Sequence, residues 1–166
     1  MAEAAVSVIL TSARNQDLVL LLIKRVEHEA DPWSGQIALP GGRRDPEDSG
    51  LLATAVRETG EETGVDLSGN QPLGELDDVY PRTPVLPAIF VRPFVFYLPS
   101  GPRLALGPEV ALAIRVTLGD LKARACRATV DARGSLHLVD GYRIGPHFLW
   151  GLTERIVTPL LSLASS

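Results

Sequence analysis

The sequence predicts an α/β fold in which helices cover both faces of a mixed β-sheet. Residues 5–11 and 18–24 are apolar, β-branched runs separated by a short polar segment, the pattern of a β-hairpin. Residues 49–63 repeat apolar side chains at helical spacing, and residues 148–164 do so again near the end of the chain. Strands that lie between two amphipathic helices favour a three-layer α/β/α sandwich.

The remaining elements follow from shorter patterns. Further strands are predicted over residues 36–40, 73–80, 85–98 and 112–118, and a hairpin over residues 127–139. The hairpin is expected to turn at Ala132–Ser135, and Pro93 indicates a bend or an edge position in its strand. A short helix is predicted at residues 119–124. The C-terminal helix is interpreted as core packing, with a kink at Pro159.

Length and composition restrict the class of protein. The chain has 166 residues, which suits one domain spanning residues 1–166. A net charge of −4 argues against nonspecific nucleic-acid binding. Cys126 is the only cysteine, which indicates a reducing compartment. No signal peptide and no apolar run of about 18 residues is present, so we expect a cytoplasmic protein without membrane contact. A homodimer is compatible with the sequence but not required by it.

The helix predicted at residues 49–63 has clear end signals. Asp48 or Ser49 can act as N-cap, and Gly64 stands where a glycine ends many helices. Its expected buried face contains Leu51, Leu52, Ala55, Val56 and Thr59.

The last turn of this helix carries Glu58, Glu61 and Glu62, which spacing places on one face. Acids at a helix C-terminus oppose the macrodipole at a cost of about 0.3–1 kcal/mol each. A solvated acidic surface is the ordinary interpretation. A divalent cation would turn the same repulsion into attraction, and carboxylates with substrate phosphates form the usual ligand shell of Mg²⁺ or Mn²⁺. Gly41 and Gly42 allow close backbone approach, so a main-chain carbonyl can join that shell.

Residues 42–65 resemble the Nudix box, G-x5-E-x7-R-E-U-x-E-E-x-G-U, where U is apolar. The matching residues are Gly42, Arg57, Glu58, Glu61, Glu62, Gly64 and Val65. Asp48 stands where the box has its first glutamate, with eight residues rather than seven before Arg57. Thr59 takes an apolar position of the box.

Segments outside the box resemble the coenzyme A diphosphatase branch of this family. The similarity includes "LLIKR…SGQIALPGGRRDPED", "PEVALAIRVTL" and "FLWGLTERI", and extends over roughly residues 5–160. The substrate signature of that branch matches less well. Val26 stands where a small residue is expected, and His28 lies at a different spacing from the glycine.

The resemblance implies a Nudix-type α/β/α sandwich and hydrolysis of a nucleoside diphosphate linked to another moiety. Coenzyme A or a derivative is the first expected substrate; ADP-ribose, dinucleotides and nucleoside triphosphates remain open. It implies Mg²⁺ or Mn²⁺ held by Glu58, Glu61 and Glu62, with the carbonyl of Gly41 as a weaker ligand. Arg57 is expected to orient Glu61 or Glu58 through an ion pair, the alternative being a plain surface salt bridge.

Water must lose a proton as it attacks the diphosphate, and the expected base is Glu58 or Glu109. Glu109 matches the position of an acid that the family places on a loop outside the box. Candidate substrate-binding residues are Arg43, Arg25, Arg44, Arg82 and Trp33. A nucleotide-binding sensor that has lost catalysis is the alternative from another class, but the three box glutamates favour an enzyme.

Overall fold

A computed structural model of the chain describes residues 1–28, 36–81, 88–132 and 134–164. Its strands are β1 (Ala2–Ser12), β2 (Leu18–Arg25), β3 (Ile37–Ala38), β4 (Gly41–Arg43), β5 (Gly74–Glu75), β6 (Ile89–Leu98), β7 (Val110–Thr117), β8 (Ala125–Ala132), β9 (Ser135–Ile144) and β10 (His147–Leu149). Its helices are α1 (Leu51–Thr63), α2 (Leu118–Ala123) and α3 (Leu152–Ala164).

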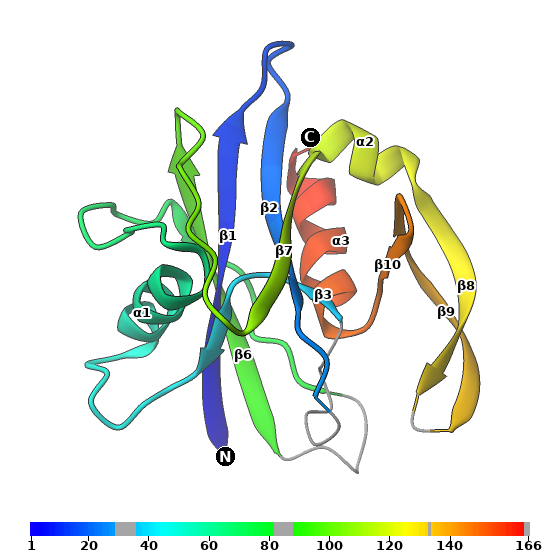
Figure 1. Cartoon of the computed structure of the whole chain (residues 1–166), viewed down its shortest axis with the longest axis horizontal. Coiled ribbons are helices and arrows are strands. Elements are labelled where there is room, and N and C mark those ends of the chain that lie inside the picture. Colours follow the sequence, from blue (N-terminus) through cyan, green and yellow to red (C-terminus); the bar gives the residue numbers. More distant parts are fainter. Residues whose placement is uncertain (29–35, 82–87, 133, 165–166) are drawn as a thin grey trace.

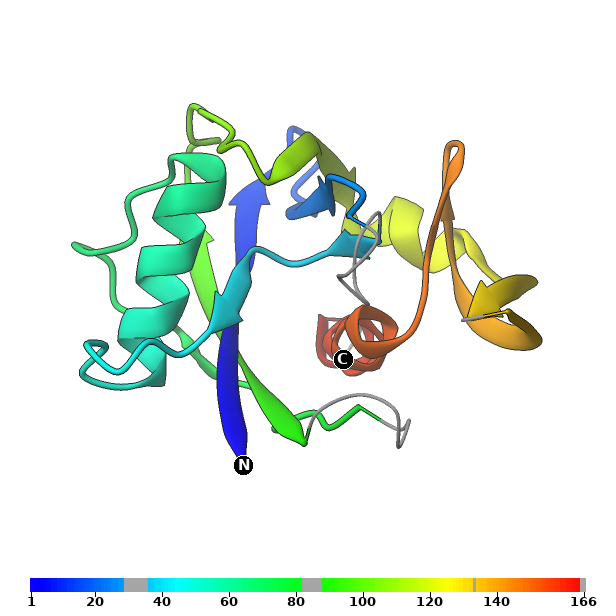
Figure 2. The same cartoon turned by 60° about the horizontal axis from the view of Figure 1, so that its bottom comes forward.

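A seven-stranded mixed sheet forms the central layer (Figure 1). Its main path is β3-β2-β1-β6-β5, with β4 also pairing β1 and β7 also pairing β2. The β1–β6 pair is parallel, whereas the other pairs are antiparallel. Helices α1 and α3 lie on opposite faces of this sheet (Figure 2). The predicted α/β/α sandwich is confirmed.

Both faces of the sheet are covered, which explains the continuous apolar runs of its first two strands. Val8 and Leu10 of β1 pack into the core on the α3 side, whereas Ile9 between them packs on the α1 side. Leu21 of β2 likewise faces the α1 side, and its neighbours face the other core. Side chains that alternate between two buried faces give strands that are mostly apolar on both faces.

A second sheet of three strands, β10-β9-β8, lies beside α2 and α3 (Figure 1). The predicted hairpin is present, and Ala132 pairs with Ser135 across its turn. The prediction of a helix from residue 148 is wrong at its start, because His147–Leu149 form β10 and α3 begins at Leu152. The strand pairing with Tyr142–Ile144 takes precedence over the helical pattern there.

The strand predicted at residues 73–80 is shorter than expected. Only Gly74–Glu75 form β5, and Val79 makes an isolated bridge to Val91. The amide of Leu76 donates to the carbonyl of Pro93, which has no N–H to return a bond. The proline therefore interrupts the ladder without ending β6, which remains paired with β1 along its length.

Strands β1 and β2 separate partway along the sheet. β1 pairs β2 only over Leu10–Ser12, whereas Ala4–Val6 pair β4. The far end of β2 pairs β3 instead, whereas β7 pairs β2 from Val19 to Arg25. Gly41 makes this arrangement possible, because a Cβ there would lie 2.2 Å from the carbonyl oxygen of Ala5. The β3–β4 segment therefore connects the two separated strands, with β3 paired to β2 and β4 paired to β1.

Helix α1 matches its prediction at the C-terminal end and differs at the start. Gly64 adopts the left-handed conformation and donates its amide to the carbonyl of Gly60. The predicted capping by Asp48 or Ser49 is wrong: the N-cap residue is Gly50, without a side-chain cap. Leu52, expected in the buried face, is exposed, whereas Thr54 is buried.

The departure of Thr59 from the box pattern has a structural counterpart on β1. Thr59 is fully buried, and its hydroxyl donates to the Ser7 hydroxyl at 2.7 Å. The Ser7 hydroxyl in turn donates to the carbonyl of Ala55 at 3.5 Å. A polar residue is tolerated at this apolar position because its hydroxyl has a buried partner.

This hydroxyl pair predicts a non-additive pair of substitutions. Ser7→Ala removes the acceptor of a buried hydroxyl and is expected to lower the free energy of unfolding by about 1–2 kcal/mol. The double variant Ser7→Ala/Thr59→Val removes both hydroxyls, so its loss should be smaller than the sum of the two single losses. Urea denaturation of the four proteins measures this coupling, and strictly additive losses would contradict it.

Candidate active site

The carboxylates of the last turn of α1 face the glycine-containing strand β4. Glu62 is buried, Glu58 is partly buried and Glu61 is exposed, with side-chain exposures of 6%, 20% and 59%. Helix spacing brings the three side chains to one end of α1, as predicted. Burial differs because α1 packs against β1 and β4 on one side only.

The Glu62 carboxylate forms hydrogen bonds with both β2 and β4. Its Oε2 accepts from Nη1 of Arg25 at 2.6 Å, and its Oε1 accepts from the amide of Gly41 at 2.7 Å. Nη2 of Arg25 donates to the carbonyl of Gly41 at 2.9 Å. Burial raises the pKa of Glu62 above its usual value, although Arg25 opposes this shift.

Arg57 connects three acids across the face of α1. Its Nε and Nη2 each donate to a carboxylate oxygen of Asp48 at 2.9 Å. Its Nη1 lies 3.0 Å from Oε1 of Glu58 and 3.4 Å from Oε1 of Glu61. Arg57 thus contacts both glutamates that the sequence assigned to it. The sequence suggested Asp48 as a helix cap, but its carboxylate instead accepts two hydrogen bonds from this guanidinium.

Glu58 lies directly against the backbone of β4. A Cβ on Gly42 would stand 2.6 Å from the carboxyl carbon of Glu58 and 2.8 Å from both oxygens. A side chain at this position would therefore displace the Glu58 carboxylate from β4. Burial raises the pKa of Glu58, and the hydrogen bond from Arg57 acts in the opposite direction.

The donor set fits a divalent cation by its chemistry and its charge. Four carboxylates share the guanidinium groups of Arg25 and Arg57, so negative charge is in excess. The raised pKa values of Glu58 and Glu62 have burial as their first cause, and a cation would oppose that effect. Within the described parts of the chain, no three His, Cys, Asp or Glu side chains form a preformed cluster.

Glu109 lies on the loop that precedes β7, and this loop contacts the end of α1. The amide of Gly107 donates to the carbonyl of Glu62 at 3.0 Å, and the carbonyl of Glu109 accepts from Val26 at 2.9 Å. The Glu109 side chain is 66% exposed and lies 3.3 Å from Nε2 of His28. The fold therefore brings this loop to the same end of α1 as the box glutamates.

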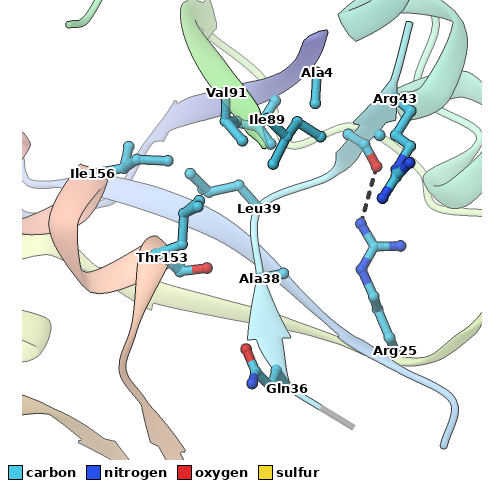
Figure 3. A pocket seen from close by; sticks show the side chains of 14 residues that line it. Ala4, Arg25, Gln36, Ala38, Leu39, Arg43, Ile89, Val91, Thr153 and Ile156 are labelled. Atoms are coloured by element: carbon cyan, nitrogen blue, oxygen red, sulfur yellow. Dashed lines mark hydrogen bonds between the residues drawn. The ribbon is translucent and has the colours of Figure 1, made fainter. Parts of the chain in front are cut away.

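A cavity of about 390 Å³ opens where β1 and β2 separate. Its polar lining comes from Arg25, Gln36, Arg43, Thr153 and the backbone of Gly41 and Gly42. Arg25 and Arg43 lie together at one end, and Ile156 lies at the other (Figure 3). Its apolar lining comes from β1, β3, β6 and α3, through Ala4, Val6, Ala38, Leu39, Ile89, Val91, Leu152 and Ile156.

Arg44, another predicted substrate-binding residue, is not brought to this cavity. Arg44 binds Oε2 of Glu3 at 2.7 Å and is absent from the cavity lining. Arg82 and Trp33 lie outside the described residues. Sequence reasoning missed the contribution of α3, which was assigned to core packing. The signal was the "FLWGLTERI" segment, in which Leu152 and Thr153 line the cavity.

The ion pair of Asp48 predicts a pH-dependent contribution to stability. The hydrogen bonds from Arg57 are the first cause that lowers the pKa of Asp48 well below its usual range. An acid with a lower pKa in the folded state stabilises the fold above its unfolded pKa, near 3.8, and loses this contribution as the pH falls further. The stability difference between wild type and Asp48→Asn should therefore shrink in strong acid. Urea denaturation at several pH values tests this, and a constant difference would contradict it.

No helix in the described residues is both long and apolar enough to cross a bilayer.

Comparisons with known proteins agree with this fold and motif. The family profile described as NUDIX domain matches residues 1–133. The uncharacterized Nudix hydrolase NudL of Yersinia enterocolitica is 46% identical over 57 residues, 34% of this chain and 29% of that protein. The chain therefore covers less than a third of that relative's length.

Two solved structures share the fold. The MutT/nudix family protein of Enterococcus faecalis has a TM-score of 0.65 at 21% identity, over 99% of this chain and 62% of that chain. The NUDIX domain of Shewanella oneidensis NrtR, solved with ADP ribose, has a TM-score of 0.57 at 21% identity, over 73% and 75%. With the family profile spanning most of its length, the chain belongs to the Nudix hydrolase family.

Proposed function

We propose that the chain hydrolyses the diphosphate bond of a nucleoside diphosphate linked to another moiety. The observation that carries this proposal is the position of Glu58 and Glu62, whose carboxylates lie against Gly42 and Gly41 where these glycines line the cavity. A diphosphate between the glycines and Arg25 or Arg43 would lie beside the acids of α1. The solved relative from Shewanella binds such a compound, ADP ribose.

Glu58, Glu61 and Glu62, with the carbonyl of Gly41, would hold Mg²⁺ or Mn²⁺. When bound, the cation neutralises charge that develops on the phosphate oxygens. Arg43 and Arg25 supply positive charge at the polar end of the cavity and bind phosphate oxygens in a forked geometry. Arg57 holds Glu58 and Glu61 in place, anchored by Asp48.

Two carboxylates can take the proton from the attacking water. Glu58 is partly buried with a raised pKa, which brings a base closer to the working pH. Glu109 is exposed on a loop beside the same helix end. We favour Glu58, because its carboxylate is held by Arg57 beside Gly42, whereas the Glu109 side chain is exposed and contacts His28.

The cavity supports a substrate with a charged end and a less polar end. Its volume lies within the range of small-molecule sites, about 300–1,000 Å³. Coenzyme A or a derivative is our first candidate, from the segments that resemble that branch. ADP-ribose, dinucleotides and nucleoside triphosphates are the alternatives.

A substrate panel with product identification tests the proposal. Purified protein is incubated with coenzyme A, ADP-ribose, a dinucleotide and a nucleoside triphosphate, each with Mg²⁺, with Mn²⁺ or with EDTA. The expected result is cation-dependent release of two phosphorylated products from at least one diphosphate. No hydrolysis of any compound, together with nucleotide binding by calorimetry, would instead favour a non-catalytic sensor.

A further inference from the structure

Arg25 contacts two of the oxygens that the proposed function assigns to the cation. Its guanidinium lies 2.6 Å from Oε2 of Glu62 and 2.9 Å from the carbonyl oxygen of Gly41. The two contacts use different nitrogens, so the fork of the guanidinium bridges helix α1 and strand β4. A positive group therefore stands between two oxygens suited to a metal ion.

The other contacts of Glu62 restrict where a cation can bind. Its second oxygen, Oε1, accepts from the amide of Gly41 at 2.7 Å, which fixes the carboxylate against β4. A cation that binds both Glu62 and the Gly41 carbonyl must approach from the side of Arg25. A divalent cation and a guanidinium in contact repel each other, most strongly where the carboxylate is buried.

We propose that Arg25 competes with the divalent cation for Glu62 and the Gly41 carbonyl, so that cation binding releases its guanidinium toward the cavity. This inference rests on the proposed function, because it takes these two oxygens as cation ligands. Arg25 is at the end of β2, paired with Val110 of β7, so its backbone position is fixed by the sheet. Rotation of the side chain alone is sufficient to release the guanidinium.

The cavity beside Arg25 can accommodate the released guanidinium. Arg25 already lines the cavity, beside Arg43 (Figure 3). Its side chain is 23% exposed, so one side of it faces open space. Cation binding would thus make the guanidinium of Arg25 available beside Arg43 at the polar end of the cavity and couple the binding of the cation to that of the diphosphate.

The opposite role for Arg25 makes the opposite prediction. If Arg25 only positions Glu62 for the cation, its removal should weaken cation binding. If Arg25 competes, its removal should strengthen cation binding. The sign of the change in affinity separates the two roles without any measurement of turnover.

The test is Mn²⁺ binding, measured from the electron paramagnetic resonance signal of free Mn²⁺ at about pH 8, where carboxylates are ionised. The proteins are the wild type, Arg25→Lys, Arg25→Gln and the control Arg127→Gln. Arg127 pairs with Asp140 on the β8–β9 hairpin, and both side chains are 69% exposed, so the control changes the charge equally at a remote surface.

Mn²⁺ affinity should rise in the order wild type, Arg25→Lys, Arg25→Gln, with about a tenfold gain for Arg25→Gln. Lysine retains a charge but cannot bridge both oxygens with a planar fork, so an intermediate affinity is expected. Arg127→Gln should match the wild type. Thermal unfolding in EDTA verifies that each variant folds. If Arg25→Gln does not fold, the Mn²⁺ affinity of Arg25→Lys is compared with that of the wild type.

Unchanged or weaker Mn²⁺ binding by the Arg25 variants would overturn the competition. If the wild type binds Mn²⁺ and the variants bind no more tightly, only this inference fails. If no variant and no wild type binds Mn²⁺, the metal site of the proposed function fails with it.

Discussion

Replacement of Glu62 by glutamine is expected to reduce turnover of a diphosphate substrate by at least roughly 100-fold. The substitution removes the negative charge that would hold the cation. It also replaces the charged acceptor of Arg25, whose Nη1 lies 2.6 Å from the Glu62 carboxylate, with a neutral amide. Turnover is measured with the compound that the substrate panel identifies, at saturating Mg²⁺ and well below the unfolding midpoint of the variant.

Glu75→Gln is the matched control for this substitution. Glu75 lies on the short strand β5 and is exposed, and the same charge is lost there without contact with the site. The control should retain wild-type turnover. Glu61→Gln adds a second comparison, because Glu61 is exposed and its loss should cost activity with little change in stability. A fully active Glu62→Gln protein would remove Glu62 from the proposed ligands.

Arg57 is the second position where a large effect is expected. Arg57→Ala should lower turnover or the apparent affinity for Mg²⁺ by about 10–100-fold, because groups that orient metal ligands have effects of this size. The guanidinium holds Glu58 and Glu61 while both oxygens of Asp48 hold it. Arg57→Lys should restore little, since an ammonium group cannot donate in this forked geometry.

The alternative for Arg57 is a plain surface salt bridge, which contributes about 0–1 kcal/mol to stability and nothing to turnover. Arg127→Ala provides the comparison, because Arg127 forms an exposed pair with Asp140. Turnover measured over a range of Mg²⁺ concentrations separates the two interpretations. An Arg57→Ala protein with wild-type turnover and Mg²⁺ dependence would favour the surface salt bridge.

The sequence predicted those parts of the fold that depend on local pattern. The spacing of Glu58, Glu61 and Glu62 and the end of α1 at Gly64 follow from helix geometry, and the structure agrees. The β1–β2 hairpin follows from two apolar runs around a polar turn. The break opposite Pro93 was foreseen only as a bend or an edge, because the proline's missing N–H matters only once its neighbour is known.

The remaining features depend on contacts between distant segments. Arg25 and Glu62 are 37 positions apart, and no periodicity indicates that their side chains meet. Asp48 carried the signal of a helix cap, but its carboxylate meets Arg57 once the loop before α1 folds back. Leu152 and Ile156 gave a helical core pattern, and only the separation of β1 from β2 makes them line a cavity.

Departures from the box pattern were compensated locally. Asp48 is shorter than the glutamate of the box, yet it still binds Arg57 through both oxygens. Thr59 replaces an apolar residue, and Ser7 on the neighbouring strand supplies the partner that its hydroxyl requires. Neither change displaces Glu58, whose carboxylate remains against Gly42.

Mn²⁺ titration of the wild type and of Glu58→Gln, Glu61→Gln and Glu62→Gln tests the central claim most directly. The claim is that the acids at the end of α1 hold a divalent cation beside the cavity. We expect the wild type to bind Mn²⁺ and each variant to bind it more weakly, while Glu75→Gln binds it normally. Equal Mn²⁺ binding by the wild type and the three α1 variants would contradict the claim, as would no binding by any of them.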